Sequence, residues 1–278
     1  MQNLDWRQWS SHKQRVVTGL GLAIPILFIV GAGPLWSLVL LIEIGVATGL
    51  WELYRILSPE GPPLTRRWEA FYISVGLLLP LGAFLGGSEG LHGALVAGLF
   101  FGFFSLLAVS PLDPAGLSRL ARFSLAWLYI PYLLSFVLLI GRLEHGRAWI
   151  VVSLAVVVAG DMGAYYTGKN LGRHKLYERV SPKKTVEGSI GGFIASMVVG
   201  TAMGYVCLDG VAPGALLLLS GTLALVGQVG DLVESMMKRV SGIKDSSGLI
   251  PGHGGLLDRL DSLLFVFPAA WLFLTKLN

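Results

Sequence analysis

Long apolar runs follow one another along this chain, separated by short polar stretches. Each run is near the ~20 residues that a helix needs to cross the hydrocarbon core of a membrane. The pattern therefore predicts an all-α polytopic membrane protein with about nine transmembrane helices. The expected spans cover approximately residues 16–32, 35–52, 70–86, 91–110, 123–140, 148–167, 188–207, 212–230 and 261–276.

The composition agrees with this interpretation. Hydrophobic residues make up 54% of the chain and charged residues 14%, whereas a soluble domain has about 25% charged residues. A transmembrane β-barrel would show short segments of alternating hydrophobicity instead. The single cysteine, Cys207, excludes an internal disulfide and a zinc site built from several cysteines.

The basic residues indicate an orientation. With the N-terminus on the cytoplasmic side, 18 of the 21 Lys and Arg residues fall in cytoplasmic segments. The other three are Arg142, Arg147 and Lys276. Lys and Arg favour the cytoplasmic side of membrane proteins, so we expect a cytoplasmic N-terminus and an external C-terminus.

Two polar loops, 168–187 and 231–260, stand out from the apolar background, and both lie between the last four predicted helices. We therefore divide the chain into an N-terminal transmembrane scaffold, 1–147, and a C-terminal transmembrane catalytic half, 148–278. In the predicted orientation both loops are cytoplasmic.

Four aspartates from three helices are expected near the cytoplasmic ends of the catalytic half. Asp161 lies toward the inner end of one span and Asp231 at the end of another, while Asp258 and Asp261 begin the last helix. A charge within a span is costly and usually functional, although Asp161 as a structural ion pair is the alternative. Glu234 and Lys238, four apart, suit an ordinary helix-surface pair. Glu43 and Glu52 receive no role.

Clustered carboxylates beside basic residues suit a divalent metal and a polyphosphate. Mg²⁺ prefers oxygen ligands and often binds through one or two carboxylates together with substrate phosphates. Lys183 and Lys184 are candidates for phosphate contacts, or they serve only to set the topology. His253 lies in the sequence PGHGG, which is either a flexible turn or a backbone that approaches a phosphate closely. The residues alone predict metal-dependent phosphoryl or nucleotidyl transfer to a lipid.

Two sequence blocks resemble the signature of the phosphatidate cytidylyltransferases, also called CDP-diglyceride synthases. The longer block reads Ser235-x-x-Lys238-Arg239, Lys244-Asp245, Ile250-Pro251-x-His253-Gly254-Gly255 and Asp258-Arg259-x-Asp261. The other reads Asp161-x-Gly163-Ala164-Tyr165 and Ser181-Pro182-Lys183-Lys184-Thr185-x-Glu187-Gly188. The resemblance is strong over residues 123–267.

The resemblance implies transfer of CMP from CTP to phosphatidate, which gives CDP-diacylglycerol and pyrophosphate and uses Mg²⁺ as one or two ions. It implies a homodimer in the bacterial cytoplasmic membrane, in contact with membrane lipid, with its active site on the cytoplasmic side and no nucleic-acid partner. The expected metal ligands are Asp231 and Asp258, supported by Asp261 and Asp161. The expected catalytic set adds Lys238, Arg239 and His253. The expected substrate-binding residues are Ser181, Lys183, Lys184, Ser235, Lys244 and Arg259.

Three other functions remain open. A CTP-dependent lipid-alcohol kinase would release CDP rather than pyrophosphate. A CDP-alcohol phosphotransferase needs further acids ahead of a GxxxDxxxD motif, whereas Asp258 and Asp261 are three apart. A transporter would use Asp161 and Glu43 as ion sites, but the charges gather at one face rather than at the midplane.

Overall fold

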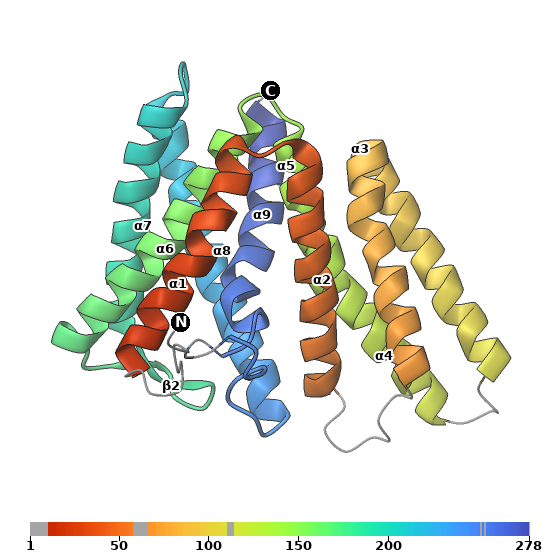
Figure 1. Ribbon diagram of the computed structural model, residues 1–278. Helices are drawn as coiled ribbons and strands as arrows, with labels where there is room; N and C mark the ends of the chain where they lie inside the picture. The colour runs from red at the N-terminus through yellow and green to blue at the C-terminus, as the bar shows by residue number, and fades with distance from the viewer. Residues whose placement is uncertain (1–10, 58–65, 110–113, 251, 253, 278) are drawn as a thin grey trace, which may run out of the picture.

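The computed structural model describes residues 11–57, 66–109, 114–250, 252 and 254–277. Helices lie side by side in one layer, with their ends at two opposite faces (Figure 1). The described residues contain one sheet, a two-stranded antiparallel hairpin. The helices are α1 (Ser11–Ala32), α2 (Leu35–Leu57), α3 (Arg66–Val109), α4 (Pro114–Trp127), the π-helix η2 (Leu128–Tyr132), α5 (Leu133–Gly141), α6 (Gly146–Leu171), α7 (Val186–Cys207), α8 (Pro213–Val240) and α9 (Leu257–Leu277), and the strands are β1 (Lys175–Tyr177) and β2 (Ser181–Thr185).

The all-α polytopic architecture is confirmed, but the count of nine spans is wrong. Within the described residues, six helices are long and apolar enough to cross a membrane, and Val17–Ala32 is a shorter apolar helix. Two predicted spans, 70–86 and 91–110, correspond to the two limbs of α3, which counts once among the six. The predicted span 261–276 belongs to α9, whose first turns carry acids and are not part of a long apolar stretch.

Helix α3 folds back on itself at Gly87. The backbone of Gly87 has φ 64° and ψ −144°, a conformation that favours a residue without a Cβ. The two limbs pack tightly next to this kink, because a Cβ on Gly82 would lie 2.5 Å from the carbonyl oxygen of Gly90. Both ends of α3 therefore reach the same face of the layer (Figure 1).

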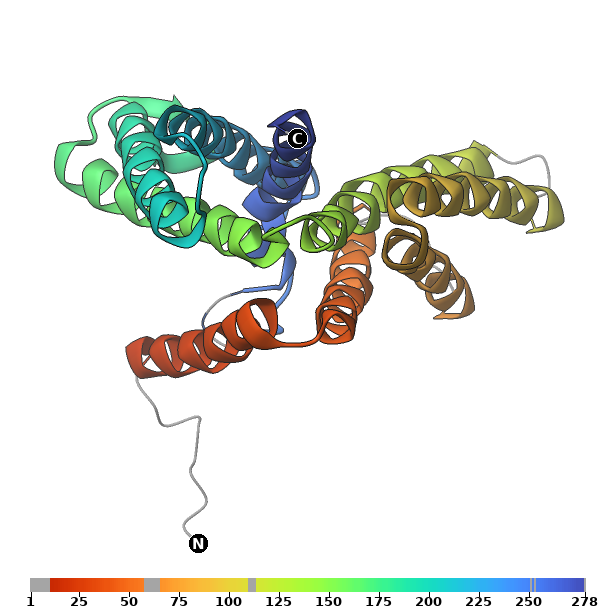
Figure 2. The same cartoon turned by 90° about the horizontal axis from the view of Figure 1, so that it is seen from above.

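Seen from above, α6, α7, α8 and α9 gather on one side, and α3 lies with α4 on the other (Figure 2). The division at residue 147 stays a prediction. The two groups are nevertheless packed together, since α5 contacts α9 through Phe136 and Trp271, whose ring centroids are 5.3 Å apart. Helix α2 joins them near its C-terminal end, where Ser241 Oγ donates to the Ile56 carbonyl at 2.5 Å.

Small residues bring α6 and α7 into close contact. A Cβ on Gly192 would lie 2.7 Å from the Gly160 carbonyl oxygen, and one on Gly163 would lie 2.6 Å from the Cβ of Ala195. Ser196 Oγ donates to the Val156 carbonyl at 2.7 Å across the same contact. Membrane helices associate readily through such small residues, and this packing sets Asp161 on α6 opposite the hairpin that precedes α7.

Candidate active site

Two neighbouring cavities lie among helices α6 to α9 and the polar loops that connect them. The first has a volume of about 400 Å³ between α6, α7, α8 and β2. Its polar lining includes Asp161, Lys183, Lys184, Ser189, Gln228 and Asp231, and its apolar lining includes Val156, Val157, Leu223 and Ala224. We call it the mixed cavity.

The second cavity is almost wholly polar and has a volume of about 280 Å³. We call it the acidic cavity. Asp161, Asp231 and Ser262 line both cavities, so the two meet at these side chains. The remaining residues of the acidic cavity are Lys238, Asp245, Asp258, Arg259 and Asp261.

Asp231 connects α8 to the hairpin. Its carboxylate forms an ion pair with Lys184 of β2. The side chains of Asp231 and Lys184 are mostly buried, with 28% and 29% of their surface exposed. Ser235, one turn further along α8, donates its hydroxyl to Asp231 at 3.4 Å. The predicted residues Asp231, Lys184 and Ser235 therefore lie together, and Lys183 lines the same cavity with an exposed side chain.

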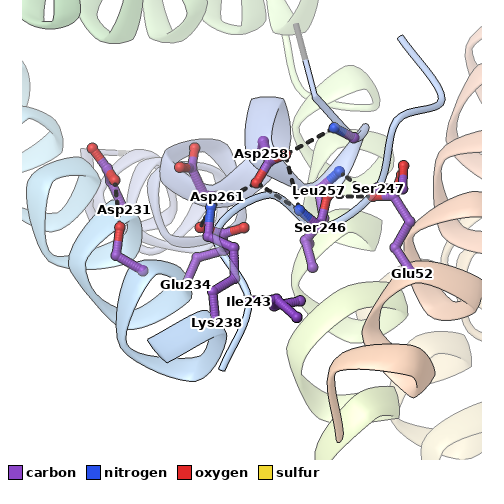
Figure 3. A network of polar contacts seen from close by, with 12 residues as sticks. Glu52, Asp231, Glu234, Lys238, Ile243, Ser246, Ser247, Leu257, Asp258 and Asp261 are labelled. Carbon is purple, nitrogen blue, oxygen red and sulfur yellow. Dashed lines mark hydrogen bonds and ion pairs between the residues drawn. The ribbon is translucent and has the colours of Figure 1, made fainter. Parts of the chain in front are cut away.

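Lys238 lies between two buried carboxylates. Its Nζ is 2.5 Å from Glu234 Oε2 and 2.6 Å from Asp258 Oδ1 (Figure 3). Burial alone would raise the pKa of Asp258, but hydrogen bonds from Lys238 and from the Gly255 N–H outweigh it and hold this pKa below its ordinary value. The predicted pair between Glu234 and Lys238 exists, but it is buried and includes Asp258 as a third member.

Asp258 also holds the loop before α9. Its Oδ2 accepts hydrogen bonds from the Ser246 N–H at 3.1 Å and from the Gly255 N–H at 2.8 Å. Both carboxylate oxygens of Asp258 thus have donors. Asp261, one turn further along α9, accepts from the adjacent Ser262 N–H at 2.7 Å and faces the acidic cavity.

Several predicted residues lie elsewhere in these loops. Arg239 donates to the Val180 carbonyl at 3.1 Å and to the Ile243 carbonyl at 3.2 Å, and so braces the hairpin against the end of α8. Lys244 is exposed, Arg259 is exposed at the rim of the acidic cavity, and Ser181 begins β2. His253 lies outside the described residues.

Glu187 fixes the hairpin that carries the two lysines. Its carboxylate accepts from the Arg173 N–H at 3.0 Å, from the His174 N–H at 3.2 Å and from His174 Nδ1 at 2.6 Å. Thr185 caps α7 by accepting from the Gly188 N–H at 3.1 Å. These bonds tie both ends of the hairpin to each other and to the first turn of α7.

Glu52 is a site-supporting residue that the sequence interpretation missed. Its carboxylate is fully buried at the end of α2 and contacts the loop before α9 (Figure 3). The signal in the sequence is an acid within a largely apolar helix. Its partners follow it by about two hundred positions, and no local pattern links them.

The carboxylates fit a magnesium ion that is shared with a substrate. Within the described residues, no three His, Cys, Asp or Glu side chains form a group that holds a metal by itself. Mg²⁺ commonly takes one or two carboxylates and completes its shell with water and phosphate oxygens. Asp161, Asp231 and Asp261 line one cavity and supply oxygen donors of this kind.

Comparison with known proteins identifies the family. The model of the cytidylyltransferase family matches residues 13–277. A phosphatidate cytidylyltransferase of Bacillus subtilis (strain 168) is 35% identical over 259 residues, which cover 92% of this chain and 95% of that protein. The chain belongs to the phosphatidate cytidylyltransferase family.

Shorter matches support the membership. Phosphatidate cytidylyltransferases of Staphylococcus saprophyticus and of Staphylococcus aureus (strain COL) are each 46% identical over 125 residues. These matches cover 45% of this cytidylyltransferase and 48% of each relative, about half of either chain. The family resemblance expected from the two sequence blocks is confirmed.

Proposed function

We propose that the two cavities form the site at which this cytidylyltransferase transfers CMP from CTP to phosphatidate. The reaction gives CDP-diacylglycerol and pyrophosphate. One observation carries the assignment of the site: Asp161 and Asp231 line both cavities. The mixed cavity has apolar walls and two lysines, and the acidic cavity is rich in carboxylates. A lipid phosphate and a nucleotide triphosphate would meet at these aspartates.

The mixed cavity suits phosphatidate. Its apolar side chains on α6 and α8 match the start of an acyl chain, and Lys183 and Lys184 offer point charges to a phosphate monoester. The acidic cavity suits the triphosphate of CTP, provided that a cation accompanies it. Arg259 at the rim adds a planar donor that binds phosphate in two-point geometry.

The chemical step is an in-line displacement. A phosphate oxygen of phosphatidate forms a bond to the α-phosphorus of CTP, and the bond from that phosphorus to the oxygen bridging to the β-phosphorus breaks. The electron pair leaves with pyrophosphate. Because the attacking oxygen is already anionic, the protein has to position two anions and neutralise their charge, as in phosphoryl transfer generally. No strong base is needed.

Asp231 and Asp261, with Asp161, are the carboxylates that would hold Mg²⁺. When bound, the ion would neutralise charge on the phosphate oxygens of CTP. The sequence interpretation placed Asp258 among the first-choice ligands. Its two oxygens already accept from Lys238 and from backbone N–H groups, so we propose that Asp258 organises the site instead.

We further propose that the site faces the cytoplasm of a bacterial cell and that the enzyme is a homodimer in the cytoplasmic membrane. The loops 168–187 and 231–260 lie at the same end of the layer as the start of α1 (Figure 1), and together they carry ten of the 21 Lys and Arg residues. The positive-inside preference supports a cytoplasmic location for that end and for the N-terminus. The dimer rests on the family resemblance, and chemical crosslinking in membranes tests it.

Product analysis tests the activity. Purified protein in mixed detergent–phosphatidate micelles is given Mg²⁺ and CTP labelled either in the cytosine or in the γ-phosphate. The proposal predicts cytosine label in a lipid product and γ-label in pyrophosphate. γ-Label in the lipid with release of CDP would instead identify a lipid kinase, and CTP that stays intact would refute the proposed activity. Omission of Mg²⁺ is expected to abolish turnover.

A further inference from the structure

The buried carboxylate of Glu52 is held by four donors. Oε2 accepts from Ser246 Oγ at 3.0 Å and from the Leu257 N–H at 2.7 Å. Oε1 accepts from Ser247 Oγ at 2.5 Å and from the Leu256 N–H at 3.0 Å. Each oxygen thus receives one hydroxyl and one backbone N–H, which is a complete solvation shell for a charge that is 0% exposed.

The donors come from both ends of one loop. Ser246 and Ser247 begin the stretch, while Leu256 and Leu257 begin α9, where unpaired N–H groups and the helix dipole favour a negative charge. Asp258 binds the same loop from the other side, since Ser246 donates its hydroxyl to Glu52 and its N–H to Asp258 (Figure 3). The two acids clamp the stretch between them.

Gly255 leaves the room that this clamp needs. A Cβ at this position would lie 2.0 Å from Ser246 Oγ and 2.6 Å from Glu52 Oε1. Packing therefore requires a glycine at the last position of the PGHGG sequence, independently of any contact with phosphate. It allows a carboxylate from a distant helix to reach the backbone of the loop.

Helix α2 provides a fixed support for the clamp. The carbonyl of Ile56 accepts from Ser241 Oγ at 2.5 Å, and the carbonyl of Leu57 accepts from Arg122 Nη1 at 3.2 Å. The end of α2 is thus bonded both to the turn after α8 and to α4. Glu52, one turn earlier, transmits that fixed position to the loop.

We propose that Glu52 is a positioning residue of the cytidylyltransferase reaction. It does not line either cavity. By holding Ser246, Ser247, Leu256 and Leu257, it sets the start of α9 so that Asp258 meets Lys238 and Asp261 faces the acidic cavity. The catalytic part of this inference rests on the proposed function, whereas the clamp itself can be tested without turnover.

The hydrogen-bond pattern makes the negative charge essential. In Glu52→Gln, the side-chain NH₂ group faces one of the two backbone N–H groups, of Leu256 or Leu257, so that two donors point at each other. The backbone N–H cannot rotate away, and flipping the amide only places the NH₂ group against the other N–H. Aspartate keeps the charge and both acceptors but is one methylene shorter. Glu52→Gln is therefore the disruptive change, and Glu52→Asp is the conservative one.

The experiment compares full-length Glu52→Gln, Glu52→Asp and the parent in detergent, with Glu43→Gln in the same helix as the matched control. Hydrogen–deuterium exchange of peptides covering 244–257 reports the clamp. Initial rates with CTP, phosphatidate and Mg²⁺ report catalysis.

For Glu52→Gln we expect faster exchange confined to this stretch and the start of α9, and a kcat reduced by about 10–100-fold, as for outer-shell partners of metal sites. Glu52→Asp should lie between, and Glu43→Gln should match the parent.

Three results would overturn the proposal. One is a Glu52→Gln enzyme with kcat and KM within about twofold of the parent. Another is lost activity with unchanged exchange in 244–257. The third is exchange that rises across the whole chain in Glu52→Gln and equally in Glu52→Asp, which would make Glu52 a general stability residue. If the parent itself does not use CTP, the exchange pattern still decides whether the clamp exists, and the proposed function fails separately.

Discussion

Lys184 and Asp231 form an ion pair that joins the hairpin before α7 to the end of α8. Both side chains line the mixed cavity, and both retain some exposure. Ion pairs with access to water contribute only about 0–1 kcal/mol to stability. Lys184 can therefore exchange its carboxylate partner for a substrate phosphate at small cost, while Asp231 becomes available to a cation.

The two lysines of the hairpin are expected to differ. Lys184→Ala removes the counter-charge of Asp231, so we expect kcat to fall by about 100-fold, as for removal of one electrostatic contact in an active site. Lys183→Ala removes an exposed charge from the cavity wall and should mainly raise the apparent KM of CTP or phosphatidate. Initial rates with each substrate varied separately distinguish the two effects. Unchanged kinetics in Lys183→Ala would make it a topology residue.

Asp231→Asn should abolish turnover and leave the fold intact. The substitution keeps the size of the side chain, and the ion pair it breaks is partly exposed, so the unfolding temperature in detergent should change little. Activity should not return at high Mg²⁺ concentration, because a neutral amide is a poor ligand for that ion. A variant with near-normal activity would exclude Asp231 as a metal ligand.

Asp258→Asn is expected to behave differently, because its partner Lys238 is buried. The substitution removes one of the two carboxylates that Lys238 contacts and leaves Glu234 as its partner, and it also weakens the bonds to Ser246 and Gly255. Buried donors left without an acceptor cost about 1–3 kcal/mol. The variant should therefore unfold at a markedly lower temperature and lose activity. Thermal unfolding of Asp258→Asn and Asp231→Asn side by side gives the comparison. Equal stability of the two would argue that Asp258 is a ligand after all.

Part of this site could be read from the sequence. Apolar run lengths predict the helices, and the clustering of acids at one end follows from the alternation of basic loops. That reasoning brought Asp161 and Asp231 together correctly, as the shared cavity lining confirms. It did not reveal that Asp258 joins the Glu234–Lys238 pair, because an i,i+4 pattern carries no information about a third partner twenty residues later.

Long-range contacts account for the other misses. Nothing near Glu52 in the sequence points to residues 246–257, so its role appears only in three dimensions. The span count was also too high. Two of the predicted spans are the two limbs of α3, which folds back at Gly87 through its backbone conformation, next to the polar residues Ser88 and Glu89.

Glu187 should control the hairpin rather than the chemistry. Glu187→Gln loses part of its bonding to Arg173 and His174, so Lys183 and Lys184 become less well placed. We expect higher KM values with a smaller change in kcat, together with faster proteolysis within 172–185. The matched control is Glu178→Gln, an exposed acid in the turn of the same hairpin. Equal kinetics for the two variants would contradict the bracing role.

The contact between α6 and α7 should tolerate no side chain at Gly192. A Cβ there would lie 2.7 Å from the Gly160 carbonyl and 3.0 Å from the Cβ of Ala164, and such overpacking costs about 1–3 kcal/mol for a small group. Gly192→Ala should lower the unfolding temperature, and Gly192→Val should lower it further. Since α6 carries Asp161 and the hairpin joins α7, activity should fall in the same order. Gly214→Ala is the control, because nothing lies within 4 Å of the added methyl and alanine favours a helix. A Gly192→Ala enzyme as stable as Gly214→Ala would show that the helices can move apart without cost.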